Sequence, residues 1–204
     1  GRLLLISLNR KKYKNFTTEE LIEKAQSDDV CAVEELIKRY QNTVYASFYY
    51  LSKDCSDILD LTQEALVKMS KNIKNLREPK KFKSWLNQIV TNLFYDYLRR
   101  KNRSCQTVSI DNKTDEQENA NVIELPARCN NPEEKTLSGE LNDVIEESVR
   151  KLPDSFRLAI VLREFQGLSY EEIASITNTS VGTVKSRIAR ARNKLQEYLK
   201  GYIA

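Results

Sequence analysis

Histidine is absent from this 204-residue sequence, and its four cysteines never form a C-x-x-C pair. Structural zinc sites take ligands from closely spaced cysteine and histidine pairs, and histidine is also the commonest general base. Only five glycines are present, and no glycine-rich phosphate loop occurs. We therefore expect no metal, no cofactor and no catalytic residue, which argues against an enzyme. Cys31, Cys55, Cys105 and Cys129 are expected to stay reduced, the usual state in the cytoplasm.

Long apolar runs are missing as well. The stretch from Leu3 to Ile6 is far shorter than the ~20 residues that a membrane-spanning helix needs. We expect no membrane insertion and a cytoplasmic location. Glycine and proline are scarce in a chain that is 40% apolar and 30% charged, which is typical of a soluble, mostly helical protein. Residues 1–15 are assigned to an N-terminal tail.

Apolar residues recur at helical spacing through most of the chain, and no segment alternates as a β-strand would. Thr17 and Glu20 form a capping box, and residues 16–103 predict a compact bundle of helices. Residues 104–135 lack periodicity and hold 3 basic and 7 acidic side chains, so we expect a flexible acidic linker there. Residues 136–204 predict a second helical domain.

Residues 169–200 have the layout of a helix-turn-helix. Ser169 and Glu172 form a capping box that begins a short helix, and Asn178 can adopt the left-handed backbone of the turn that ends it. A longer helix follows, capped by Ser180, with an apolar face and an opposite face that is basic. It contains six Lys/Arg and one Glu. The second helix of a DNA-binding helix-turn-helix enters the major groove N-terminus first.

The charge of this helix alone would fit an ordinary antiparallel helix pair with a solvated basic face. The capping box, the asparagine in the turn and the capped basic helix together favour DNA binding. The expected fold class is therefore all-α, with an N-terminal helical bundle joined by a flexible acidic linker to a C-terminal helix-turn-helix domain.

Residues 71–103 are the most basic part of the chain, with ten Lys/Arg and two acidic side chains. Aromatic residues are interleaved with them, and this combination suits the binding of unstacked single-stranded bases. Trp85 shares a helix face with Ile89, so we expect it in the core. Phe94 and Tyr95 lie off that face and are expected at the surface.

Three segments, in this order, resemble bacterial sigma factors. Residues 57–69, around Asp-Leu-Thr-Gln-Glu, resemble the polymerase-binding helix, and residues 82–100, beginning Phe-Lys-Ser-Trp-Leu, resemble the segment that melts the promoter and binds the −10 element. Residues 152–187, with Gly-Leu-Ser-Tyr-Glu-Glu-Ile-Ala and Val-Gly-Thr-Val-Lys-Ser-Arg, resemble the −35-binding domain. The chain length and the bare linker are similar to the extracytoplasmic-function (ECF) group of the sigma-70 family. The resemblance covers nearly everything from residue 16 to residue 199.

The resemblance implies a dissociable subunit that binds core RNA polymerase, at the largest-subunit clamp helices and the flap, and directs promoter recognition, melting and transcription initiation. It also implies an anti-sigma factor as a regulatory partner. The expected polymerase-binding residues are Asp60, Leu61, Gln63 and Glu64. The expected −10-binding residues are Arg77, Lys80, Lys81, Lys83, Asn92, Asp96, Arg99 and Arg100. The expected −35-binding residues are Ser180, Thr183, Lys185, Ser186, Arg187 and Arg190.

A stand-alone transcriptional regulator with a similar C-terminal helix-turn-helix is the alternative. Such a protein would need neither the basic, aromatic block at residues 71–103 nor the helix at residues 57–69. Binding to core polymerase distinguishes the two functions.

Overall fold

The computed structural model describes residues 13–52, 56–107 and 138–203. Within these ranges every regular element is helical, as the apolar periodicity predicts. The described elements are α2 (Thr18–Gln26), α3 (Val30–Leu51), α4 (Ile58–Asn72), the 3-10 turns η1 (Ile73–Asn75) and η2 (Pro79–Lys81), α5 (Phe82–Thr107), α6 (Ser138–Lys151), α7 (Asp154–Ile160), a π-helical turn (Val161–Phe165), α8 (Tyr170–Thr177) and α9 (Val181–Ile203). None of the helices in the described ranges is long and apolar enough to span a membrane.

The first described helix of the N-terminal bundle, α2, begins at the predicted cap. The Thr17 hydroxyl accepts the N–H of Glu20 at 3.2 Å, and the Glu20 carboxylate accepts the N–H of Thr17 at 2.7 Å. Helix α3 begins where the Asp29 carboxylate accepts the N–H groups of Cys31 and Ala32. The apolar faces of α2 to α5 then pack into one core, which includes Leu21, Phe48, Leu61, Met69 and Val90.

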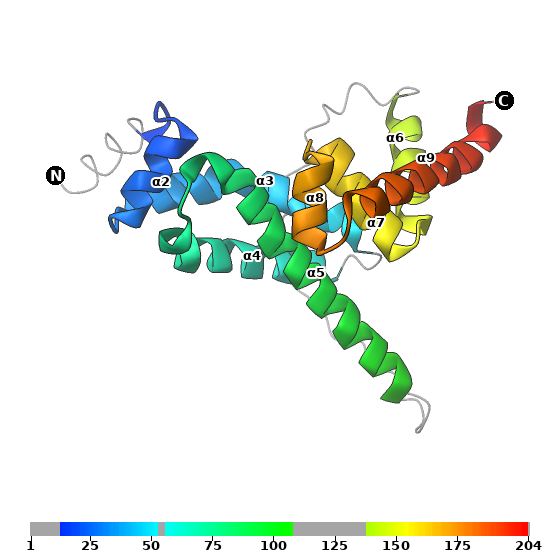
Figure 1. Ribbon diagram of the computed structural model, residues 1–204, viewed down its shortest axis with the longest axis horizontal. Helices are drawn as coiled ribbons and strands as arrows, with labels where there is room; N and C mark the ends of the chain where they lie inside the picture. The colour runs from blue at the N-terminus through cyan, green and yellow to red at the C-terminus, as the bar shows by residue number, and fades with distance from the viewer. Residues whose placement is uncertain (1–12, 53–55, 108–137, 204) are drawn as a thin grey trace.

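Helix α5 extends to Thr107, beyond the predicted domain boundary at residue 103. Its second half projects away from the rest of the molecule (Figure 1). The remainder of the predicted acidic linker, residues 108–135, lies outside the described residues.

The C-terminal domain contains the predicted helix-turn-helix, α8 and α9. Gly167 ends the π-helical turn at φ 64°, a left-handed conformation that glycine adopts without the penalty of a Cβ atom. The capping box of Ser169 and Glu172 then begins α8, and Asn178 turns the chain at φ 52°. The all-α fold, with a helical bundle and a C-terminal helix-turn-helix domain, is thus confirmed.

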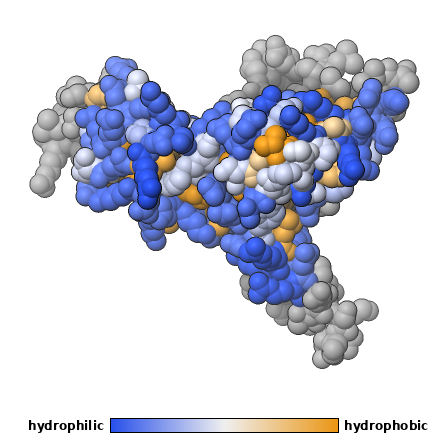
Figure 2. Space-filling model, viewed as in Figure 1, coloured by the Kyte–Doolittle hydropathy of each residue, from blue (hydrophilic) through white to orange (hydrophobic). Residues whose placement is uncertain are grey.

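The two domains pack against each other, with the C-terminal domain lying along α3 and α5 of the bundle (Figure 1). One hydrophobic core cluster includes residues of both domains. The face of the molecule shown in Figure 2 is mainly hydrophilic, with a small apolar patch over the C-terminal domain.

Candidate nucleic-acid and polymerase interfaces

The predicted DNA-binding side chains of the C-terminal domain gather at the start of α9. Ser180 caps this helix by accepting the N–H of Thr183 at 3.0 Å. The exposed members of the predicted set are Ser180, Lys185, Ser186 and Arg190. Arg187 and Thr183 are half-buried. The apolar side of α9 packs into the domain through Val184, Ile188 and Ala191, so the basic side points outward.

A cavity of about 260 Å³ lies between α4, η1 and the first half of α5. Its lining residues are Lys68, Asn72, Asn75, Trp85, Ile89 and Asn92. Water occupies ~30 Å³ per molecule in the liquid, so this volume exceeds that of several water molecules. The asparagine side chains offer hydrogen-bond donors and acceptors, and the Trp85 indole offers a stacking surface.

Of the predicted −10-binding residues, only Asn92 lines this cavity. All eight are exposed. Three of them are engaged in surface ion pairs: Lys81 with Glu78 at 2.9 Å, and Arg99 with Asp96 at 2.9 Å. The Asp96 carboxylate thus pairs with Arg99 through one of its two oxygens.

Sequence reasoning missed the other cavity residues for a physical reason. They belong to α4, α5 and the η1 turn between them, and the packing that brings these elements together is not marked by local spacing in the sequence. Trp85 packs against the core, in line with its expected position, but it is only half-buried and also forms part of the cavity wall. The asparagines at positions 72 and 75, three residues apart at the end of α4, were the one available signal.

The predicted polymerase-binding residues lie on α4, with one exception. Asp60 and Gln63 are exposed, and Glu64 forms an ion pair with Lys68 at 3.0 Å on the helix surface. Leu61 is only 2% exposed and packs in the core, so its assignment to the docking surface was wrong. Its apolar side chain follows the buried stripe of the helix rather than the polar one.

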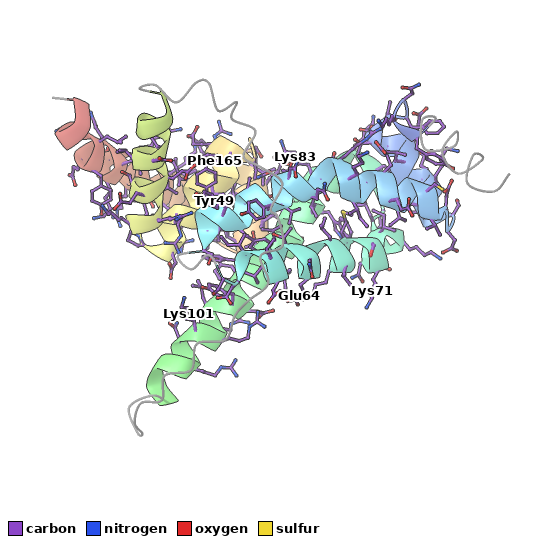
Figure 3. All side chains as sticks on the ribbon, turned by 180° about the vertical axis from the view of Figure 1, so that it is seen from behind. Tyr49, Glu64, Lys71, Lys83, Lys101 and Phe165 are labelled. Atoms are coloured by element: carbon purple, nitrogen blue, oxygen red, sulfur yellow. The ribbon has the colours of Figure 1, made fainter. Side chains whose placement is uncertain are left out.

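Two exposed apolar side chains on α4 were not predicted. Leu59 and Val67 are 38% and 47% exposed, and they belong to the four large hydrophobic residues exposed in the described part of the chain. They lie two helical turns apart, on either side of Gln63 along the helix. Exposed apolar side chains within a polar rim are typical of a protein–protein contact. In Figure 3, Glu64 and Lys71 mark the outer side of α4.

Comparison with known families decides which protein class has these interfaces. Residues 36–104 match the model for sigma-70 region 2, and residues 142–195 match the model for sigma-70 region 4. A curated "ECF RNA polymerase sigma-E factor" of Haemophilus influenzae is 35% identical over 188 residues, which cover 92% of this chain and 97% of the relative. The chain belongs to the ECF sigma factors.

Further relatives agree with this assignment. The sigma-E factor of Escherichia coli K12 is 36% identical over 191 residues, covering 92% of this sigma factor and 98% of the relative. The solved sigma factor RpoE of Bartonella quintana, in complex with the anti-sigma factor NepR, has a TM-score of 0.62 at 27% identity and covers 82% of this chain and 96% of its own. CnrH, in complex with the cytosolic domain of CnrY, shares the fold, with a TM-score of 0.61 at 22% identity, covering 90% and 97%.

Membership of this family establishes the function class. The protein is a sigma factor, which directs promoter recognition and transcription initiation with RNA polymerase. Sigma factors are not an enzyme class. A stand-alone regulator would not need region 2, so the match to that region excludes the alternative.

Polar contacts join the two domains of this sigma factor. The Gln166 amide donates to the Ser47 hydroxyl at 2.8 Å in a buried site, and the Tyr49 hydroxyl donates to the Glu146 carboxylate at 2.7 Å. The Arg150 guanidinium lies 4.3 Å above the Tyr49 ring, a cation–π distance. These contacts join α3 to α6 and to the residue after the π-helical turn.

Helix α8 contacts the start of α5 in the same interface. The Ser84 hydroxyl donates to the Glu172 carboxylate, and this bond is the largest cause that holds the pKa of Glu172 below its usual value. The rings of Tyr50 and Phe165 lie 4.1 Å apart between their centroids. Figure 3 shows Tyr49 and Phe165 close together where the two domains meet.

The aromatic residues expected at the surface of α5 lie in or beside this interface. Phe94 is fully buried, and the guanidinium of the buried Arg157 lies 5.8 Å from its ring centre. Its predicted exposure is therefore wrong, because the C-terminal domain covers it. Burial raises the pKa of the Tyr95 hydroxyl, while the nearby positive charge of Arg187 opposes that shift. The half-buried Arg187 of the recognition helix therefore lies near Tyr95 of α5.

Proposed function

We propose that this sigma factor divides promoter binding between its two domains. Residues 16–103 bind core polymerase and the −10 element, residues 136–204 bind the −35 element, and residues 104–135 connect them. The observation that supports this most directly is the cavity between α4 and α5. It combines amide side chains, an indole ring and a basic rim on the domain that also exposes the α4 surface.

The cavity would accept one base of the melted −10 strand. An unpaired base exposes its Watson–Crick edge, which short amide side chains such as that of Asn92 can hydrogen-bond. Trp85 would stack on the base. Exposed basic residues of the same domain would bind phosphates and hold the strand in register; they are Arg77, Lys80, Lys81, Lys83, Arg99 and Arg100. Asp96 would act by orienting Arg99 through their ion pair.

The start of α9 would bind the −35 element in the major groove. Lys185, Arg187 and Arg190 can neutralise phosphates or bind guanine edges. Ser180, Thr183 and Ser186 contribute hydroxyl groups at the end of the helix that enters the groove first. Phosphate contacts would set the position of the helix, and base contacts would set its sequence preference.

The exposed side of α4 would dock on the clamp helices of the largest polymerase subunit, and the C-terminal domain would contact the flap. Leu59 and Val67 would act as apolar anchors, and Asp60, Gln63 and Glu64 would form the polar rim. Run-off transcription with core polymerase tests the whole assignment. Promoter-specific transcripts should appear only when this protein is added.

A double variant, Gln63→Ala with Glu64→Arg, should weaken core binding about 10-fold through charge repulsion at the rim. The fold should remain intact, since Gln63 is exposed and the Glu64–Lys68 pair lies on the surface, where such pairs contribute at most about 1 kcal/mol. Fluorescence titration with core polymerase measures the loss, and circular dichroism checks the fold.

The matched control is Glu19→Arg, a charge reversal at an exposed site on α2 that should bind core normally. Unchanged core binding by the double variant would remove α4 as the docking surface. An equal loss in the control would attribute the effect to net charge alone.

We further infer that the packed arrangement of the two domains is the state of the free chain. The relative from Bartonella quintana was solved with an anti-sigma factor, so we propose a partner of that kind here as well. Such a partner would act in the cytoplasm, where polymerase is found. The chain would perform no chemistry of its own.

A further inference from the structure

Gln26, the last residue of α2, holds the turn that forms one side of the cavity. Its side-chain amide donates to the backbone carbonyl of Ile73 at 3.1 Å and to that of Leu76 at 2.7 Å. These carbonyls flank the η1 turn, where α4 ends. Carbonyl groups at a helix end have no partner within the helix, so a side-chain donor there fixes the path of the chain.

A second contact joins the same two segments but contributes less. The Lys74 ammonium group lies 2.6 Å from the carboxylate of Asp28, two residues after Gln26. Both side chains are more than half exposed, and ion pairs of this kind add little to stability. The half-buried amide of Gln26 is therefore the main polar link from α2 to η1.

The turn that Gln26 holds presents Asn75 to the cavity. Ile73 and Leu76 are buried on either side and anchor the turn to the core. Asn75 extends between them and donates weakly to the side-chain oxygen of Asn72 at 3.4 Å. A small shift of the two carbonyls would therefore move the Asn75 amide and change the hydrogen-bonding pattern that the cavity offers to a base.

We propose that Gln26 is a positioning residue for base selection at the −10 element. It acts through the η1 turn and does not touch DNA. The inference rests on the proposed role of the cavity. Helix α2 precedes the segment that matches sigma-70 region 2, which begins at residue 36. Base preference would thus depend on a helix outside that matched segment.

The test is Gln26→Met, which keeps the side-chain length and removes the donor. Holoenzyme containing the variant is assayed for promoter opening on templates that differ at one melted −10 position. The ratio of opening between the preferred and the disfavoured base should fall about 5- to 10-fold, the effect of losing one or two neutral hydrogen bonds. Binding of the Gln26→Met variant to core polymerase and to a −35 duplex should be unchanged. The control variant is Gln41→Met, at an exposed site on α3, which should change neither the opening ratio nor either binding affinity.

Two outcomes would overturn the inference. An unchanged ratio would show that the turn does not need the amide, and an equal loss of opening on every template would indicate a merely structural role. Asn92→Ala is assayed in parallel, because it probes the cavity directly. If Asn92→Ala alters base preference and Gln26→Met does not, the cavity proposal survives and the role of Gln26 fails. If neither alters it, the cavity proposal fails as well.

Discussion

Holoenzyme with Arg187→Ala should bind promoters about 1–3 kcal/mol more weakly, the loss expected when a bidentate contact to a base is removed. Arg187 lies early in the recognition helix, where side chains reach base edges. The loss should be confined to templates with the −35 element and should vanish on templates that lack it. Filter binding with both template types measures the difference.

Asn92→Ala is the matched variant on the other domain. It should bind the −35 element normally and reduce opening of the −10 region, which permanganate footprinting detects on unpaired thymines. Normal opening together with lost −35 binding would show that the proposed division between the domains is wrong. A uniform loss for Arg187→Ala on both template types would identify this residue as a phosphate contact instead.

Weakening the contact between the domains should increase DNA binding by the free chain. Tyr49→Ala removes the hydrogen bond to Glu146 and the cation–π contact with Arg150, and Gln166→Ala removes the buried bond to Ser47. These interactions contribute ~0.5–1.5 kcal/mol each, so the double variant should bind promoter fragments about 10-fold more tightly. Fluorescence anisotropy without polymerase measures this affinity.

The unmodified free chain should bind duplex promoter DNA weakly at physiological salt, for two reasons. Neither domain alone buries much DNA surface, and in the packed arrangement polymerase does not set the spacing between the two domains. Gln196→Ala, at an exposed site on α9, serves as the control and should not change the affinity. Tight specific binding by the unmodified chain, or no gain in the double variant, would refute a closed free state.

The local signals in the sequence predicted the helix starts well. Capping depends on side chains within three residues of each other, so the caps at Thr17, Ser169 and Ser180 could be predicted without tertiary information. The turn at Asn178 could be predicted for the same reason, because asparagine tolerates the left-handed backbone that this turn needs.

Features that depend on packing between distant segments could not be predicted. Periodicity placed Phe94 off the main apolar stripe, and only the docking of the C-terminal domain explains its burial. The same limit applied to the cavity, which needs Asn72 and Asn92 from different helices. Leu61 was misassigned because the resemblance identified the docking helix without fixing which of its faces points outward.

The burial of Phe94 beneath Arg157 has a consequence at the scale of the cell. In the packed arrangement the contacts between the two domains, rather than polymerase, set the spacing of the two DNA-binding domains, so the free chain would be a poor decoy when it outnumbers core polymerase. Surplus molecules would leave promoters vacant instead of blocking them. The amount of transcript would then follow the concentration of assembled holoenzyme. Overproduction of this protein would raise transcription of the genes that it controls to a plateau and would not repress them.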